Sequence, residues 1–141
     1  MTDPSISVSD HATDADLQFI EERINEYNFA TTGLHDARLL VIVLRDAAGR
    51  ICAGLTGHTW GRAAEIRFLW VDDAMRHAGL GSRLLHAAES EARSRGCRKV
   101  VLSTHSFQAP DFYCKHGYVV AGKVADYPHG HAHILFEKPL E

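Results

Sequence analysis

The sequence predicts a mixed α/β (α+β) fold, with a central mixed sheet of about six to seven strands and three to four flanking helices. Three observations carry this prediction. The 141 residues suit one domain, so residues 1–141 are expected to form a single unit. The spacing of apolar residues switches between steps of two and steps of three to four. A strand–helix–strand unit in the middle of the chain requires a parallel crossover.

The N-terminal third is expected to hold a short strand and one helix. Residues 6–8 alternate between apolar and polar, which predicts the strand. Helix-capping residue types fill positions 9–14, so the helix should begin there and end near Ala30. Apolar side chains recur at steps of three and four and predict one apolar helix face, made of Leu17, Ile20, Ile24 and Tyr27.

Three strands are expected in the middle of the chain. The β-branched run at 39–44 and the segment 51–60 predict a hairpin, and a second turn leads into a strand at 64–71. Alternation divides this third strand into two faces, with Ile66, Phe68 and Trp70 on one and Glu65, Leu69 and Val71 on the other.

The second half of the chain alternates helices with strands. Helical spacing predicts a helix over 81–95, and a strand at 99–104 completes the parallel crossover. A short helix is expected over 111–116, because a proline stands just before it and a glycine just after it. Two strands, at 118–121 and 133–137, should end the sheet.

Charge and cysteine content exclude several classes of protein. Fifteen Lys and Arg against 18 Asp and Glu, with no basic run, argue against a nucleic-acid-binding protein. The sequence shows neither a secretory signal nor an apolar stretch long enough to span a membrane, so no membrane association is expected. Three cysteines without a C-x-x-C pair fit reduced thiols, which favours a cytoplasmic location.

The junction between the third strand and the next helix has the composition of an anion-binding loop. Gly79 and Gly81 allow the backbone to turn its N–H groups toward one point at a helix N-terminus, and Arg76 adds a positive charge. A Walker loop is excluded because Ser82 follows Gly81 without a lysine. A dinucleotide fingerprint is excluded because Leu84 stands where a third glycine is required.

Two motifs in this order resemble those of the GNAT superfamily of N-acetyltransferases. Residues 76–81 fit the pattern Gln/Arg-x-x-Gly-x-Gly/Ala, and residues 109–118 fit Ala-x-x-hydrophobic-Tyr-x-x-x-Gly-Phe with Tyr118 as the final aromatic residue. The resemblance covers residues 39–137 well, whereas the N-terminal third matches only in the type of element. It implies the GNAT fold, with one N-acetyltransferase domain over residues 1–141.

The resemblance implies acetyl-CoA as cosubstrate. Backbone N–H groups of the loop would hold its pyrophosphate, the preceding strand would pair with the pantetheine arm, and an N–H near Leu69 would face the thioester carbonyl. Many members carry an asparagine at the position of Ser106, so this chain departs from the pattern there. The implied cofactor-binding residues are Leu69, Trp70, Val71, Arg76, His77, Ala78, Gly79, Leu80, Gly81, Ser82 and Ser106.

Two residues are candidates for catalysis. Tyr113 matches the family tyrosine that protonates the CoA thiolate, a task for a phenol with an ordinary pKa of about 10. Glu65 resembles in position the glutamate base of the histone-acetylating branch, and its expected face would direct it toward the acetyl end of the cofactor. An ion pair of Glu65 with Arg62 or Arg67 is the alternative, with a histidine or a water molecule as the base.

Ten histidines exceed the usual share. His129, His131 and His133 alternate and could face one side of an extended chain, but acetyl transfer of this type needs no metal, and none is expected. The family's acceptor pocket borders the strands that carry several of these histidines. Candidate acceptor-binding residues are therefore His58, His105, Tyr127 and His131.

The predicted function is acetyl transfer from acetyl-CoA to a primary amine of a small molecule, such as an amino antibiotic, by direct attack in a ternary complex. One alternative is acetylation of a lysine or N-terminus of a peptide or protein. A second alternative is an acyl-CoA-binding sensor without turnover. The oligomeric state stays open, with a homodimer as one outcome.

Overall fold

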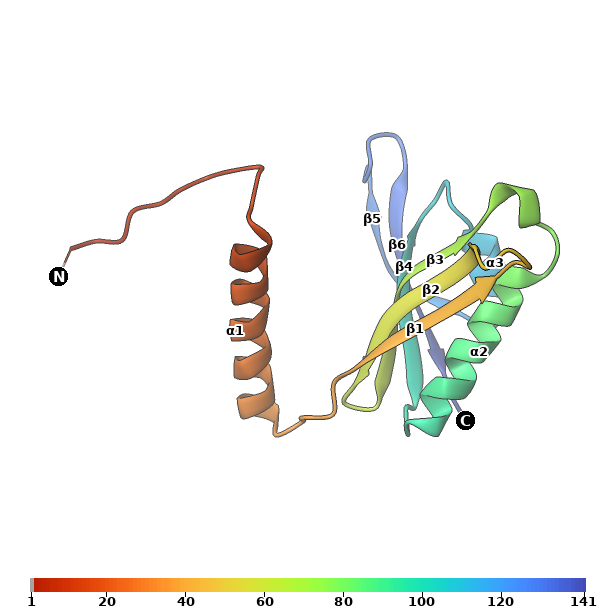
Figure 1. Cartoon of the computed structure of the whole chain (residues 1–141), viewed down its shortest axis with the longest axis horizontal. Coiled ribbons are helices and arrows are strands. Elements are labelled where there is room, and N and C mark those ends of the chain that lie inside the picture. The colour runs from red at the N-terminus through yellow and green to blue at the C-terminus, as the bar shows by residue number, and fades with distance from the viewer. Residues whose placement is uncertain (1) are drawn as a thin grey trace. The chain divides into compact units, whose positions relative to one another are not determined.

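The computed structural model describes residues 2–141 (Figure 1). It contains two compact units, of which the first ends at His35 and the second spans Asp36–Glu141. The first unit contains the helix α1 (Asp14–Thr32). The second contains a six-stranded sheet and the remaining helices.

The helix α1 is capped at both ends. The Thr13 hydroxyl accepts a hydrogen bond from the N–H of Asp16 at 3.2 Å, as the capping residues at 9–14 predict. Gly33, at φ 71°, closes the C-terminus by donating its N–H to the Phe29 carbonyl. The strand predicted at residues 6–8 is wrong, since the structure shows no strand there. Alternation alone does not make a strand, which needs a neighbouring strand to pair with its backbone.

The sheet has the order β1-β2-β3-β4-β6-β5. All neighbouring strands are antiparallel except β3 and β4, which are parallel, so the predicted mixed sheet with a central crossover is confirmed. The strands are β1 (Arg38–Arg45), β2 (Ile51–Trp60), β3 (Ala63–Val71), β4 (Lys99–His105), β5 (Val119–Ala125) and β6 (Ala132–Pro139).

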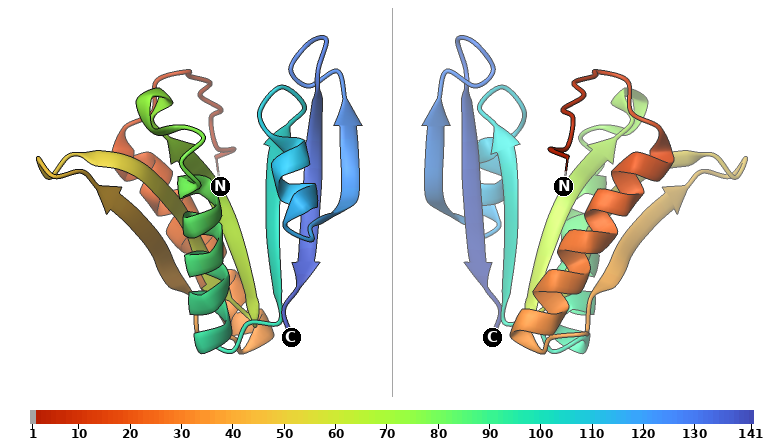
Figure 2. Two further views of the ribbon diagram at one scale, coloured as in Figure 1. Left: turned by 90° about the vertical axis from the view of Figure 1, so that its right-hand side faces the viewer. Right: turned by 90° about the vertical axis from the view of Figure 1, so that its left-hand side faces the viewer.

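Two helices cover one face of this sheet, α2 (Leu80–Ser94) in front of β1–β3 and α3 (Pro110–Lys115) in front of β4 and β6 (Figure 2). The predicted helical face of α2 is buried through Leu84, Leu85, Ala88 and Ala92. These side chains form one apolar core with buried residues of the strands, including Leu40, Leu55, Leu102 and Phe136. Apolar burial on this face holds α2 and the sheet together.

A β-bulge interrupts the pairing of β2 with β3 between Thr56 and Gly57. The strands approach so closely there that a Cβ on Gly57 would collide with the backbone carbonyl of Glu65. The bulge shifts the alternation by one residue, because one extra residue of β3 faces β2.

The predicted faces of β3 are therefore wrong beyond the bulge. Ile66 is buried before it, and Leu69 and Val71 pack against the same core after it. Phe68 does not share the Ile66 face, and Glu65 does not share a face with Leu69 and Val71. A bulge depends on how two strands meet, which alternation within one strand does not encode.

Strands β3 and β4 separate along their length. They pair only from Ala63 opposite Lys99 to Ile66 opposite Leu102, and then diverge in a V (Figure 2). Beyond this point β4 stays paired with β6 up to His105. The backbone of β3 from residue 67 to residue 71 thus faces an opening instead of a neighbouring strand.

A buried ion pair joins the two arms of the V. Glu89 of α2 receives hydrogen bonds from the Lys138 ammonium of β6 at 2.8 and 3.1 Å. The Glu89 side chain is only 3% exposed. Because a buried carboxylate is costly without a partner, this pair fixes α2 against the far arm of the sheet.

Candidate functional site

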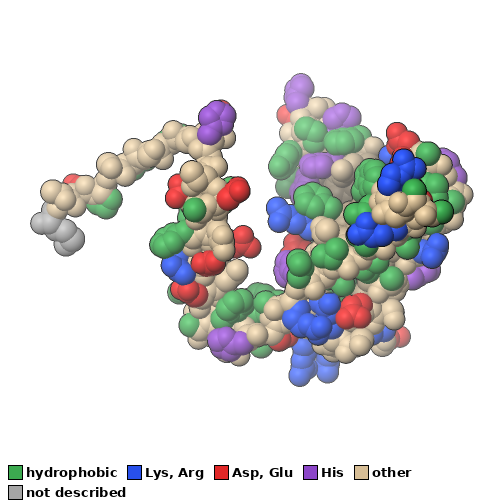
Figure 3. All heavy atoms as spheres, in the orientation of Figure 1, with side chains coloured by type: hydrophobic (Ala, Val, Ile, Leu, Met, Phe, Trp, Pro, Cys, Tyr) green, Lys and Arg blue, Asp and Glu red, His purple; other side chains and the backbone are tan. Residues whose placement is uncertain are grey.

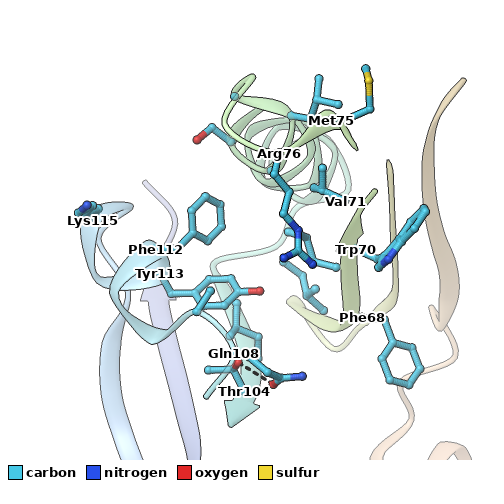
Figure 4. A pocket seen from close by; sticks show the side chains of 18 of the residues that line it. Phe68, Trp70, Val71, Met75, Arg76, Thr104, Gln108, Phe112, Tyr113 and Lys115 are labelled. Atoms are coloured by element: carbon cyan, nitrogen blue, oxygen red, sulfur yellow. Dashed lines mark hydrogen bonds between the residues drawn. The ribbon is translucent and has the colours of Figure 1, made fainter. Parts of the chain in front are cut away.

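A cavity of about 880 Å³ opens where β3 and β4 diverge. Its walls come from both strands, from the segment between β3 and α2, and from α3 with the turn before it (Figure 4). Most of the predicted cofactor-binding residues line it, namely Leu69, Trp70, Val71, Arg76, His77, Gly79, Leu80, Gly81 and Ser82. Ala78 and Ser106 are not among the lining residues.

The segment before α2 forms a tight loop. A short 3-10 turn, η1 (Asp73–Met75), is followed by His77 at φ 66° and Gly79 at φ 77°. Gly79 is the N-cap of α2, so the helix begins without a side-chain cap on its first N–H groups. A Cβ built on Gly79 would point into open space. Uncapped amides at the positive end of a helix are suited to an anion.

Arg76 adds a formal charge to this loop. Its guanidinium forms an ion pair with Asp73 at 2.9 Å. Figure 4 shows the Arg76 side chain directed into the pocket, toward Tyr113 on the opposite wall. Loop and arginine together provide an anion site at one end of the cavity.

The open edge of β3 provides a second binding element. Between residues 67 and 71, the N–H and C=O groups on the edge away from β2 face the pocket, where no strand completes the ladder. Such an edge binds an extended ligand with amide groups by adding it as a further strand. The bulge at the start of this segment changes the direction of the backbone there.

Tyr113 of α3 stands on the wall facing β3. Its ring is buried among Phe112, Tyr118 and Phe136, and its hydroxyl points into the pocket (Figure 4). Burial raises the pKa of the Tyr113 phenol above its usual value of 10.0. The phenol therefore stays protonated at neutral pH and can donate to an anionic sulfur or oxygen in the cavity.

Gln108 is a pocket residue that sequence reasoning missed. Its Oε1 accepts hydrogen bonds from the Thr104 hydroxyl at 2.9 Å and the His105 N–H at 2.7 Å. These bonds fix the side chain against the pocket wall, which leaves Nε2 as a donor on the pocket side (Figure 4). Its place five residues before Tyr113 was the available signal, but the family pattern directed attention to Ser106.

Ser106 has a structural task instead. Its Oγ accepts the Ala132 N–H at 2.9 Å, and its own N–H donates to the Ala132 carbonyl at 2.8 Å. The residue thus ties the end of β4 to the start of β6, with its Oγ accepting from the backbone, and its contact with the cofactor stays a prediction.

Glu65 lies outside the residues that line the cavity. It is directly opposite His58 on β2, and its carboxylate approaches the His58 Nε2 at 3.4 Å. The partner of Glu65 is therefore His58 and neither Arg62 nor Arg67. Both side chains are about half exposed, so the pair contributes little to stability.

The other candidate acceptor residues come together in one ring cluster, made of His105, Phe107, Tyr127, His131 and His133. The His105 ring stacks on Phe107 and contacts Tyr127 and His133, with centroids 4.7 to 5.5 Å apart. His131 packs edge-on against Phe107 at 5.0 Å. Phe107 also lines the cavity, so the cluster adjoins one end of it.

The sequence matches the model of the acetyltransferase (GNAT) family over residues 7–118. The chain belongs to the GNAT acetyltransferase family. It is 43% identical over 93 residues to the blasticidin-S acetyltransferase of Streptomyces morookaense, a match that covers 65% of this chain and 68% of the relative.

Two solved acetyltransferases share the fold over almost the whole chain. The protein from Bacillus cereus is 38% identical, with a TM-score of 0.80 over 95% of this chain and 98% of its own. A putative acetyltransferase from Agrobacterium tumefaciens is 31% identical, with a TM-score of 0.89 over 96% and 99%. The predicted fold is thereby confirmed.

As a GNAT acetyltransferase, the protein is an N-acetyltransferase that uses acetyl-CoA. The residues present fit this cosubstrate. The uncapped start of α2 suits a pyrophosphate, the open edge of β3 suits the amides of pantetheine, and Tyr113 faces the space between them. Acetyl-CoA supplies the acetyl group as an activated thioester.

The part of the chain that the structure describes has neither a membrane-spanning helix nor a cluster of metal-ligating side chains. Among residues 2–141, no helix is long and apolar enough to cross a membrane. Within that range, no three His, Cys, Asp or Glu side chains gather as a metal site. Histidines stand at several separate places on the face of the GNAT domain shown in Figure 3.

Proposed function

We propose that this enzyme transfers the acetyl group to a primary amine of a small molecule by direct attack in a ternary complex. Two observations support the proposal. A relative with 43% identity bears the name of a single compound, blasticidin-S. The ring cluster next to the pocket offers aromatic faces and imidazole nitrogens, a combination that suits a compact polar ligand.

In the proposed reaction the protein positions the reactants and stabilises charge. The loop at 76–82 holds the pyrophosphate, and the β3 edge aligns the thioester. A backbone N–H near Leu69 donates to the carbonyl oxygen as it becomes negative, which stabilises the tetrahedral intermediate. The C–N bond forms, the C–S bond breaks, and Tyr113 donates its proton to the departing thiolate.

Removal of the amine proton is assigned to Glu65, acting through water. Ile66 is the last residue of β3 that pairs with β4. Glu65 precedes it and lies on the opposite face of the sheet. An acceptor that reaches the diverging strands from that face would meet the carboxylate and His58 first. In Glu65→Gln, kcat/KM should fall most at low pH, where the amine is protonated. A variant with an unchanged pH profile would transfer the role of base to another group.

Acceptor recognition is assigned to the ring cluster. The His105 Nδ1 donates a hydrogen bond to the Tyr127 carbonyl over 3.3 Å, and this contact holds the ring beside Phe107 and Tyr127. Phe107 lines the pocket, and His131 packs against Phe107. A cytoplasmic location and a homodimer stay predictions.

Release of free CoA thiol tests the proposed function. The enzyme is incubated with acetyl-CoA and a panel of small primary amines, with lysine peptides and N-terminal peptides as a second panel. We expect thiol release with at least one small amine and a rate within about tenfold of background for the peptides. Turnover of peptides alone would overturn the small-molecule assignment.

A further inference from the structure

A histidine outside the predicted site is hydrogen-bonded to the anion-binding loop. Ser82, in the first turn of α2, lies with its Oγ 3.0 Å from Nε2 of His116. The other ring nitrogen of His116, Nδ1, lies 2.8 Å from the Phe112 carbonyl at the end of α3. Ser82 lines the cavity, and His116 stands behind it.

The carbonyl fixes the tautomer of this imidazole. A carbonyl oxygen only accepts, so Nδ1 must carry a proton in order to bond with Phe112. In the neutral ring Nε2 then has a lone pair and accepts the hydroxyl proton of Ser82. Because the only hydrogen of the Ser82 hydroxyl is then donated to His116, the Ser82 Oγ can only accept hydrogen bonds on the pocket side.

A phosphate oxygen also presents only lone pairs. It cannot bond with a serine oxygen whose hydrogen points at a histidine. If Nε2 takes up a proton, the direction of the hydrogen bond between Ser82 and His116 reverses. His116 then donates to Ser82, and the Ser82 hydroxyl is free to donate to the phosphate.

We propose that His116 acts as a positioning residue for the pyrophosphate of acetyl-CoA, by taking up a proton when the cosubstrate binds and turning the Ser82 hydroxyl toward it. This inference rests on the assignment of the pyrophosphate to the loop at 76–82. It adds one positive charge near that site, separated from the anion by the Ser82 hydroxyl.

The titratable residues closest to His116, by contact or in sequence, are on α2 and on α3 itself. On α2 the nearest ring is His86, at 5.4 Å between centroids, and Arg83 follows Ser82 in sequence. On α3, Lys115 precedes His116, and Asp111 lies in the first turn. His116 itself is the C-cap of α3, where helix carbonyls favour a cation. A bound pyrophosphate adds negative charge to this group and so favours the imidazolium.

Linkage fixes the sign of the pH dependence. If binding favours the protonated histidine, then protonation must favour binding to the same extent. The affinity for acetyl-CoA should therefore rise as pH falls through the range in which histidine titrates. Proton uptake on binding should be largest at a pH where His116 is neutral in the free protein and protonated in the complex, and it amounts to at most one proton.

The experiment measures acetyl-CoA binding by calorimetry at about pH 6 and about pH 8, in buffers with different ionisation enthalpies. For the wild type we expect proton uptake and an affinity about 3- to 10-fold higher at the lower pH. His116→Gln keeps a side-chain acceptor and donor but cannot titrate, so both effects should shrink to what the phosphates of the ligand cause alone. The difference in proton uptake between the wild type and this variant excludes the contribution of the ligand's own phosphates.

Two controls keep the outcomes distinct. His86→Gln alters the neighbouring histidine and should leave the pH dependence unchanged. Nitrogen NMR of the His116 ring in the wild type should show Nε2 gaining a proton on binding, a signal that does not depend on any variant folding. Equal proton uptake in the wild type and His116→Gln, or an Nε2 that stays unprotonated, would overturn the inference. Unaffected binding in a loop variant such as Gly79→Asp would instead overturn the assignment of the loop.

Discussion

The two walls of the pocket recognise a ligand in different ways. The wall formed by β3 and the start of α2 offers backbone N–H and C=O groups, exposed by a diverging strand and an uncapped helix. The wall formed by β4 and α3 offers side chains, above all Tyr113 and Gln108. Backbone groups suit the constant part of a cosubstrate, whereas side chains suit the proton transfer and the choice of acceptor that we propose for them.

Gly79→Asp should break the backbone wall with the largest effect. The residue sits at φ 77°, and a carboxylate there would enter the open space at the start of α2. We expect the Kd for acetyl-CoA to rise at least about 100-fold in calorimetry, from backbone strain plus repulsion of the anion. Gly79→Ala, which adds the strain without the charge, is the matched control. Equal losses in the two variants would show that charge does not matter there.

Tyr113→Phe should break the side-chain wall while leaving the backbone wall intact. The ring keeps its packing against Phe112 and Phe136, but the proton donor is lost. We expect kcat to fall about 10- to 1000-fold with an acetyl-CoA Kd within about twofold of the wild type. Full activity would assign the donor to another group.

The same tyrosine predicts a feature of the pH profile. Burial raises its pKa above 10.0, so the neutral acid persists to higher pH than in water. Activity lost through ionisation of Tyr113 should appear only above about pH 10. A descending limb of kcat at neutral pH that disappears in Tyr113→Phe would contradict this.

Lys138→Met tests the link between the walls. It leaves Glu89 buried without its partner while keeping an aliphatic chain beside Tyr118. The free energy of unfolding should drop by about 3 kcal/mol in urea denaturation. The double variant Glu89→Leu, Lys138→Met should regain most of this loss, because no buried charge remains. If the double variant is as unstable as the single one, packing and not charge holds the arms together.

Gln108→Glu should have the smallest effect, and it tests what Gln108 contributes to the side-chain wall separately from Tyr113. The carboxylate can still accept from Thr104 and from the backbone of His105, but the Nε2 donor on the pocket side is replaced by an acceptor. We expect KM for acetyl-CoA or for the amine to rise about 3- to 10-fold with little change in kcat, and which KM rises shows which ligand the amide contacts. Unchanged values of both would leave Gln108 with a purely structural role.

Sequence reasoning was most accurate where the local chain decides the structure. The loop at 76–82 combines glycines with a strand-to-helix change of period, and these features predict an anion site without any knowledge of distant residues. Tyr113 was predicted from the resemblance of residues 109–118 to the second GNAT motif. Both lie on the pocket in the structure.

It was less informative where two strands or two segments meet. The expected faces of β3 are wrong beyond the bulge against β2, and the pairing of Glu65 with His58 was not foreseen. The bond that the Ser106 Oγ accepts from the Ala132 N–H of β6 was not foreseen either, while the catalytic role of Glu65 and the cofactor contact of Ser106 stay predictions. Neither bulge nor bond is visible in the spacing of residues along one segment.

The sequence by itself determined the order of the elements from residue 14 onward and the glycine-containing junction before α2, because glycine conformation, helix capping and apolar periodicity act over a few neighbouring residues. The tertiary structure alone decided how far β3 and β4 stay paired, and with that the opening of the pocket. It also brought Ser82 to His116 and Glu89 to Lys138, which are far apart in the chain. The physical reason is that these contacts form only once the packing of α2 and α3 on the sheet has fixed the distances between them.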